Sequence, residues 1–428
     1  MFLNNLSISY RMELLASKLE KFAGEYASHL KCRDCNKEYE FSPMYICQEC
    51  FGALDVIYDL DKINLNKNDF KSRENSMWRY EELLPFKAIE EIRGLKAGFT
   101  PLIKADRLAK KLGLKELYIK NDCVNPTYSF KDRPAGLGVM AAIAFGMKAV
   151  GCASTGNLAS ATAAYASRVG LPCYIFVPDG IEYAKIYQAQ TYGAKIIRVE
   201  GTYDDANRIA TQAAEFFNIG MVNINLRPFY VEGSKTLAFE VAEQLNWEAP
   251  DVIIVPTASG ALFNAVCRGF EQLYKIGLIN KLPEKPVVAQ AEGSNPISRA
   301  FKEGKDYIEI IENPKTIAHS LAIGNPGDGI YVLRRLKQRG LAEDANNEEI
   351  IEGIRLLAEC EGIYAEPAGG VVIAVLKKLI ENGKIKEDEK VVCLITGNGL
   401  KAPEALKGKL EEPILIKPQI KYLEKWLK

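Results

Sequence analysis

The chain has 428 residues, which is too long for one compact core, so we expect two or three domains. Hydrophobic residues make up 48% and charged residues 26%, and 55 Lys and Arg balance 55 Asp and Glu. This neutral balance argues against nucleic acid or an anionic membrane as the main partner. No run approaches the roughly 20 apolar residues of a membrane helix, and the N-terminus shows no secretory pattern. We therefore expect a cytoplasmic protein.

The N-terminal part divides into three segments by composition. Residues 1–30 are predicted to form a weakly amphipathic helical arm, and residues 31–60 form a small cysteine-rich module. Residues 61–104 are a charged connector that joins the large domain. At the other end, residues 406–428 form a C-terminal tail, for which a docking helix and a frayed end both remain open.

Two CxxC pairs, separated by eleven residues, dominate the cysteine-rich module. They comprise Cys32, Cys35, Cys47 and Cys50. This spacing is typical of a zinc ribbon, in which four thiolates close a tetrahedral structural site. Such a short module has too little core to fold alone, so the metal would supply folding energy. An iron site, degenerate disulfides and a nucleic-acid-binding ribbon are the alternatives, although acidic neighbours argue against the last.

Short β-branched runs alternate with helical stretches from Glu116 onward. The runs lie at 116–120, 149–153, 173–177, 195–199, 221–225, 251–256, 286–291 and 390–395. Strands separated by helices of 10–15 residues indicate βαβ units and parallel sheets with helices on both faces. We predict an α/β fold with two open, mostly parallel sheets. One belongs to a small domain at 105–225 and the other to a large domain at 226–405.

Lys131 follows the first of these strands, in a turn that passes into a helix. Asn125 and Pro126 are typical of a turn, and Pro134 suits a first helical turn. An aldehyde cofactor needs a lysine whose amine loses its proton, and the positive end of a helix favours the neutral amine. On this pattern alone a surface cation is the commoner interpretation, so catalysis rests on the accompanying motifs.

Six segments in fixed order resemble the signature segments of threonine synthases, which are pyridoxal-phosphate enzymes of the tryptophan-synthase-β type (fold type II). They are NPTYSFKDR at 125–133, ASTGN at 153–157, EGSKTLAFE at 232–240, IGNP at 323–326, AEPA at 365–368 and TGNGLK at 396–401. The resemblance extends from Cys32 to about Pro403, and the N-terminal ribbon is similar to that of archaeal members. It implies that the chain is an enzyme that converts O-phospho-L-homoserine and water to L-threonine and phosphate.

The resemblance also assigns roles to individual residues. Lys131 would hold the aldehyde of pyridoxal phosphate, Asn157 would bind the ring hydroxyl oxygen, and Thr396 would face the pyridine nitrogen. The segment around Ser154 and Thr155 follows a strand and opens a helix, so its donors suit the substrate carboxylate. An ordinary helix-capping turn is the alternative for that segment.

The two phosphate sites depart from the family pattern. The cofactor phosphate needs a cluster of backbone N–H groups, and the candidate loop keeps one glycine where relatives carry more. This loop comprises Ala258, Ser259, Gly260, Ala261 and Leu262.

Arg227 is the candidate that would replace the family's usual ligands of the substrate phosphate, since a guanidinium binds phosphate with two hydrogen bonds. The alternative is that Arg227 is an ordinary surface residue. Tyr128 also stands where the family often has glycine. These departures leave open another elimination or replacement reaction, such as threonine or serine dehydration or sulfur addition to phosphoserine. The third alternative is a binding protein whose enzyme core has lost its catalytic activity. The expected partners are a small phosphorylated amino acid and further copies of the chain.

Overall fold

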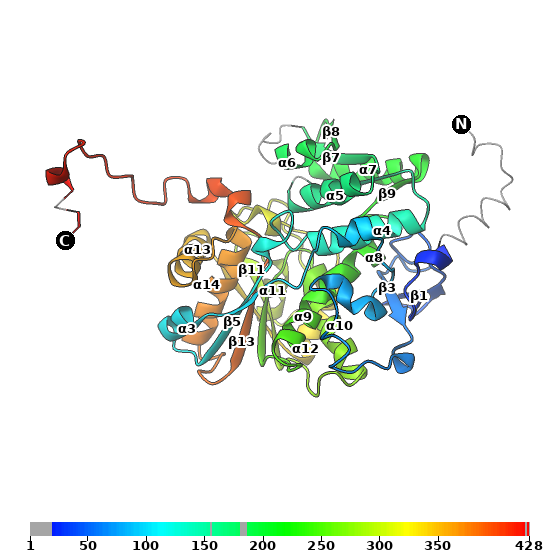
Figure 1. Cartoon of the computed structure of the whole chain (residues 1–428), viewed down its shortest axis with the longest axis horizontal. Helices are drawn as coiled ribbons and strands as arrows, with labels where there is room; N and C mark the ends of the chain where they lie inside the picture. Colours follow the sequence, from blue (N-terminus) through cyan, green and yellow to red (C-terminus); the bar gives the residue numbers. More distant parts are fainter. Residues whose placement is uncertain (1–18, 155, 180–185, 424–425, 428) are drawn as a thin grey trace.

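The computed structural model describes residues 19–154, 156–179, 186–423 and 426–427. It contains three sheets, which Figure 1 shows as separate regions of the molecule. A small N-terminal sheet lies on one side, a four-stranded sheet lies above, and a six-stranded sheet forms the lower part of the view. Fold class and parallel sheets are as predicted.

The N-terminal sheet is antiparallel, with strand order β2-β1-β3. Its strands are β1 (Ala27–Cys32), β2 (Glu38–Tyr39) and β3 (Leu54–Tyr58). Strand β1 begins inside the segment predicted as a helical arm, of which residues 1–18 lie outside the described residues. Alternate residues of β3 are buried, which matches the period of two of a strand with one covered face.

The four-stranded sheet has the order β8-β7-β6-β9, and all its pairs are parallel. Its strands are β6 (Ala149–Ala153), β7 (Cys173–Pro178), β8 (Lys195–Val199) and β9 (Ile219–Met221). The predicted strand at 221–225 was wrong by several residues, because β9 ends at Met221. Asn225 accepts a hydrogen bond from the Met221 N–H at 2.8 Å, so its side chain closes a turn there instead of extending the strand.

The six-stranded sheet has the order β12-β11-β10-β13-β5-β4, parallel except for the antiparallel pair of β4 and β5. Its strands are β4 (Leu102–Lys104), β5 (Glu116–Asn121), β10 (Val252–Pro256), β11 (Lys285–Ala291), β12 (Leu341–Ala345) and β13 (Lys390–Ile395). Strand β5 pairs with β13 here, although the prediction placed 105–225 in the small domain. Strand β12 was missed because two acidic residues interrupt its short apolar pattern.

Helices cover both larger sheets. The α-helices are α2 (Glu90–Arg93), α3 (Asp106–Leu112), α4 (Asp132–Ala144), α5 (Asn157–Arg168), α6 (Tyr187–Thr191), α7 (Tyr203–Phe217), α8 (Arg227–Glu232), α9 (Thr236–Gln244), α10 (Ala261–Lys275), α11 (Pro296–Lys302), α12 (Gly329–Gln338), α13 (Asn347–Glu361) and α14 (Pro367–Glu381). The short 3-10 helices are η1 (Leu60–Lys62), η2 (Met77–Leu83), η3 (Asp122–Val124), η5 (Gly233–Lys235), η6 (His319–Leu321), η7 (Gly399–Lys401), η8 (Pro403–Leu406) and η9 (Ile420–Tyr422). Helix α14 is almost wholly buried between the six-stranded sheet and α13, so it anchors one wall of the site.

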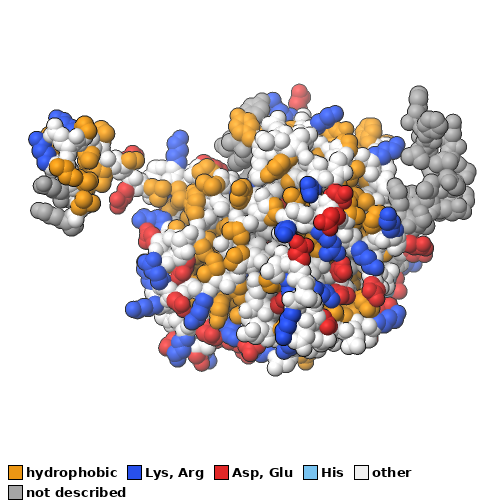
Figure 2. All heavy atoms as spheres, viewed as in Figure 1, with side chains coloured by type: hydrophobic (Ala, Val, Ile, Leu, Met, Phe, Trp, Pro, Cys, Tyr) orange, Lys and Arg blue, Asp and Glu red, His pale blue; other side chains and the backbone are white. Residues whose placement is uncertain are grey.

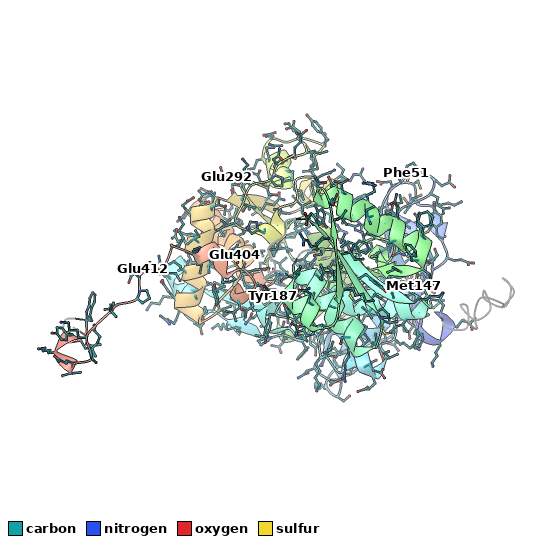
Figure 3. The ribbon with its side chains drawn as sticks, turned by 90° about the horizontal axis from the view of Figure 1, so that it is seen from above. Phe51, Met147, Tyr187, Glu292, Glu404 and Glu412 are labelled. Carbon is teal, nitrogen blue, oxygen red and sulfur yellow. The ribbon has the colours of Figure 1, made fainter. Side chains whose placement is uncertain are left out.

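The C-terminal segment leaves the body of the protein and extends to the left in Figure 1. Figure 3 shows Glu404 close to the body and Glu412 farther out along this segment. Hydrophobic side chains gather over its end in Figure 2, and Leu415 is 96% exposed. Among the described residues, no helix combines the length and the apolar character that crossing a membrane requires.

Candidate active site

Lys131 lies where the turn after β5 passes into α4, as predicted. It is the residue that precedes the first turn of the helix, and its side chain is half-buried. Its Nζ donates a hydrogen bond to the Tyr230 hydroxyl at 3.0 Å and lies 4.7 Å from the centre of the Phe130 ring. The amine is therefore held between two aromatic side chains.

A buried ionic network fixes the turn that carries Lys131. The guanidinium of Arg133 is fully buried and donates to Asp122 at 2.7 and 2.8 Å and to Glu240 at 2.8 Å. Lys120 also contacts Glu240, at 2.6 Å. Burial alone would raise the pKa of Glu240, but these two cations lower it to about 2. The network ties α4 to β5 and α9, so the backbone beside Lys131 has little freedom to shift.

The end of β13 supports the same turn from the other side. The Thr396 carbonyl accepts a hydrogen bond from the Phe130 N–H at 2.8 Å, and Ser129 bridges to Gly397. Thr396 is 3% exposed, and it lines the cavity described below. This strand end therefore places Thr396 beside the turn that presents Lys131.

Asn157 begins α5, directly after the turn that follows β6. Its amide Nδ2 donates to both carboxylate oxygens of Glu366, at 3.0 and 3.1 Å. Burial raises the pKa of Glu366, an effect that the Asn157 amide partly opposes. A Cβ at Gly397 would lie 2.4 Å from the Glu366 carboxylate, so a larger residue there would push this carboxylate out of its position. Glu366 thereby sets the orientation of the Asn157 amide.

The predicted phosphate loop at 258–262 connects β10 to α10. Gly260 has φ of 93°, a left-handed conformation that favours glycine. A Cβ there would also lie 2.7 Å from Val332 and 3.1 Å from the backbone of Asp328. The Asp328 N–H donates to the Ser259 carbonyl at 2.9 Å. The first N–H groups of α10 have no partner within the helix, so they suit an anion at this turn.

The predicted substrate residues come from two separate parts of the chain. Ser154 follows β6 and lines the cavity, whereas Thr155 lies outside the described residues. Arg227 is the first residue of α8, and its Nη2 pairs with the buried carboxylate of Asp328. The Arg227 side chain is 25% exposed and lines the cavity described below, so a ligand in the cavity can reach this residue.

One cavity of about 1580 Å³ brings these residues together. Its lining includes Lys131, Ser154, Asn157, Arg227, the loop at 258–262 and Thr396. The N-terminal module also contributes to the wall, through Tyr45, Ile46, Phe51 and Ala53. The cavity lies beyond the carboxyl ends of β6, β10 and β13, where ligands bind in open α/β sheets.

Several cavity residues were not assigned from the sequence. Tyr230 contacts Lys131 and lies just before the quoted segment at 232–240. Glu366 contacts Asn157 and lies within the quoted segment at 365–368. Lys401 also lines the cavity, where burial lowers its pKa and Ser160 accepts a hydrogen bond from it at 3.2 Å. The position of Lys401 in the quoted segment TGNGLK is the sequence signal that could have identified it.

Tyr128, the other departure from the family pattern, has φ of 67°. A bulky residue rarely adopts this left-handed conformation, which suits the glycine that the family resemblance leads us to expect here. The side chain is 51% exposed, and the carbonyl accepts a hydrogen bond from the Asn398 N–H at 3.0 Å. The turn therefore tolerates tyrosine because its ring points outward.

The four ribbon cysteines form a compact cluster whose sulfur atoms all lie within 4.8 Å of one another. The Sγ–Sγ distances are 3.4 Å for Cys32 and Cys50 and 3.5 Å for Cys35 and Cys47. Bonded sulfurs would be about 2.05 Å apart, whereas thiolates around one zinc lie about 3.8 Å apart. Burial opposes a thiolate at Cys47, but the Tyr39 hydroxyl and backbone N–H groups lower its pKa to about 6. The arrangement fits a tetrahedral metal site.

The chain matches the family of pyridoxal-phosphate dependent enzymes over residues 95–397. It is 43% identical to threonine synthase from Methanocaldococcus jannaschii over 403 residues, which cover 93% of this chain and 99% of the relative. Threonine synthase from Methanosarcina acetivorans is 39% identical over 395 residues, covering 92% of this chain and 96% of the relative. These similarities confirm the resemblance found in the sequence.

Solved structures confirm the fold. Threonine deaminase isoform 2 from Solanum lycopersicum has a TM-score of 0.61 at 22% identity, covering 72% of this chain and 82% of its own. Maize serine racemase has a TM-score of 0.60 at 21% identity, covering 79% and 98%.

Proposed function

Because the chain belongs to the threonine synthases within the pyridoxal-phosphate dependent enzyme family, we propose that it converts O-phospho-L-homoserine and water to L-threonine and phosphate. The observation that carries this proposal is that the turn at 258–262 and Arg227, both of which suit an anion, line one cavity together with Lys131. The turn at 258–262 would hold the cofactor phosphate, and Arg227 would hold the phosphate that leaves.

The residues around the cavity fit pyridoxal phosphate. Lys131 would hold the aldehyde carbon, Asn157 the ring oxygen, and the Thr396 hydroxyl would lie beside the pyridine nitrogen. When bound, this cofactor supplies an electron sink for carbanionic chemistry at the substrate. A neutral hydroxyl at Thr396, unlike a carboxylate, does not force protonation of that nitrogen. It therefore moderates the sink in a way that suits elimination and replacement.

The protons are handled by this chain's own side chains. Once its amine is free, Lys131 takes the proton from Cα of the substrate and later serves as the base at Cβ. The Tyr230 hydroxyl, 3.0 Å from Nζ, keeps the amine within the cavity. Phosphate leaves from Cγ with its bonding electrons, and Cγ then takes up a proton to become a methyl group. The hydroxyl of water adds at Cβ, and Cα regains a proton before threonine is released. The released phosphate, held by Arg227, would accept a proton from that water as it adds.

The substrate carboxylate would bind at the start of α5. Ser154 lines the cavity there, and the first turn of a 12-residue helix presents free N–H groups. Thr155, next to Ser154 in the sequence, belongs to the same proposal.

We also propose that Cys32, Cys35, Cys47 and Cys50 hold one structural zinc ion. All four ligands are thiols, which closes the coordination shell and leaves no position for a catalytic water. The further expectation of a homo-oligomer stays a prediction.

Product analysis tests the proposed reaction. Purified protein with pyridoxal phosphate should release phosphate from O-phospho-L-homoserine and form threonine in equal amounts. Borohydride should fix a pyridoxyl group on Lys131, and Lys131→Ala should abolish turnover. Wild-type protein that releases no phosphate, but deaminates threonine or serine, would replace this proposal with the dehydratase alternative.

A further inference from the structure

Seven charged side chains form one chain of ion pairs that runs from the interior to the cavity. In order they are Lys235, Glu232, Arg268, Asp55, Arg33, Asp328 and Arg227. Four cations and three anions alternate along it. Arg227, at one end, lines the cavity and is the most exposed of the seven.

Arg33 connects the N-terminal module to this chain. It lies between the predicted metal ligands Cys32 and Cys35, and its side chain is 13% exposed. Its Nε and Nη2 donate to Asp55 at 2.8 and 2.6 Å, which is the two-pronged geometry of a strong guanidinium–carboxylate pair. The remaining Nη1 donates to Asp328 at 2.8 Å. Arg33 therefore reaches out of the module into the large domain.

Asp328 is the point at which the module and the cavity meet. Its carboxylate is 1% exposed and is shared, with Oδ1 bound to Arg33 and Oδ2 bound to Arg227. Its N–H donates to the carbonyl of Ser259 in the proposed phosphate loop. Removing Arg33 would leave one carboxylate oxygen buried without its donor, and Arg227 would then face the whole charge.

We propose that Arg33 is a positioning residue for the substrate phosphate. Acting through Asp328, it holds Arg227 with one edge of its guanidinium turned to the cavity. This inference rests on the proposed function, because it takes Arg227 as the ligand of the leaving phosphate. The N-terminal module is thereby part of the active-site wall, which agrees with the place of Tyr45, Ile46, Phe51 and Ala53 in the lining.

A double-mutant cycle on the full-length holoenzyme tests this role. Arg33→Gln should raise KM for O-phospho-L-homoserine about tenfold while kcat changes less than about twofold. In an Arg227→Gln background the same substitution should not raise KM further, because the guanidinium that Arg33 positions is absent. Inhibition by inorganic phosphate should weaken in parallel, which reports binding without turnover.

Arg334→Gln is the matched control. Arg334 pairs with Asp34 of the same module at 3.0 Å, but the pair is on the surface and outside the chain of ion pairs. This variant should keep the wild-type KM. Arg33→Lys, which retains a charge, should recover part of the loss. Zinc content and melting temperature show whether each variant is folded.

The outcomes separate this inference from the proposed function. An Arg33→Gln loss of equal size with and without Arg227 would overturn the positioning role while leaving Arg227 as the clamp. A wild-type KM in Arg33→Gln would overturn it as well. If Arg227→Gln itself has no effect on KM, the clamp fails, and the role of Arg33 fails with it.

Discussion

The Nζ of Lys131 lies 3.0 Å from the hydroxyl oxygen of Tyr230. The two residues are 99 positions apart and come from opposite ends of the segment that builds the four-stranded sheet. Tyr230 lies three residues after Arg227, in the same short helix α8. The contact places the Tyr230 hydroxyl beside the amine that is proposed to hold the cofactor.

Replacing Tyr230 with Phe removes that hydroxyl while keeping the ring. We expect kcat to fall roughly tenfold to hundredfold, since a hydrogen bond to a charged group contributes about 1.5–3 kcal/mol. Cofactor content, measured from the visible spectrum, should remain. Tyr274→Phe, an exposed position on α10, is the control and should leave kcat unchanged. A wild-type kcat in Tyr230→Phe would show that the hydroxyl is not used.

Arg227→Ala should lose roughly tenfold to hundredfold in kcat/KM for O-phospho-L-homoserine, the equivalent of about 1.5–3 kcal/mol. The reason is the loss of a charge-assisted bond to the leaving phosphate. Any side reaction with unphosphorylated threonine or serine should change little, because these substrates carry no phosphate. Equal losses on both kinds of substrate would make Arg227 a structural residue.

Gly260→Ala should lower the affinity for pyridoxal phosphate and the melting temperature. The new Cβ would be forced into a left-handed backbone and would lie 2.7 Å from Val332. Strain of this kind costs about 1–3 kcal/mol. Gly277→Ala is the matched control, because φ there is 76° but a Cβ would meet no described atom within 4 Å. Equal cofactor affinity in the two variants would count against the loop as phosphate site.

Cys47→Ser should release the metal and expose the N-terminal module to protease. Zinc content measures the first effect, and limited proteolysis measures the second. The visible spectrum of the bound cofactor should stay, since no ribbon thiol is proposed to contact the ring. Cys360→Ser, at a buried cysteine outside the cluster, should keep the zinc. Unchanged metal content in Cys47→Ser would refute the assignment.

Asp132→Asn should change the pH dependence of stability. Burial raises the pKa of Asp132 to about 7, although the Thr127 amide and hydroxyl donate to Oδ2. Its Oδ1 has no hydrogen-bond partner in the described part of the chain. Between about pH 4 and 7 the unfolded state is ionised while the folded state keeps the proton, so folding stability falls as pH rises.

The Asn variant lacks this titration, so its stability relative to wild type should increase from pH 4 to 7 by up to about 4 kcal/mol. Denaturant unfolding of both proteins at several pH values measures the difference. Parallel curves would mean that Asp132 does not hold its proton in the folded state.

Much of the fold could be predicted from the sequence, because parallel strands that are buried on both faces appear as short runs of apolar residues. The runs that became β6, β7, β8, β10, β11 and β13 were located from β-branched residues and the helices between them. Strand β12 was missed, since two acidic residues interrupt its apolar pattern and only pairing with β11 makes it a strand. Likewise, Asn225 ended β9 early through a contact that composition does not reveal.

By itself, the sequence determined the chemical groups and the order of the segments: Lys131 after a strand, a glycine-bearing turn before a helix, and two CxxC pairs. These signals are local, since each depends on neighbouring residues. Only the tertiary structure decided which distant groups meet, such as Lys131 with Tyr230, Asn157 with Glu366, and Arg33 with Asp328. Those contacts join residues up to 295 positions apart, and they arise because folding brings three sheets around one cavity.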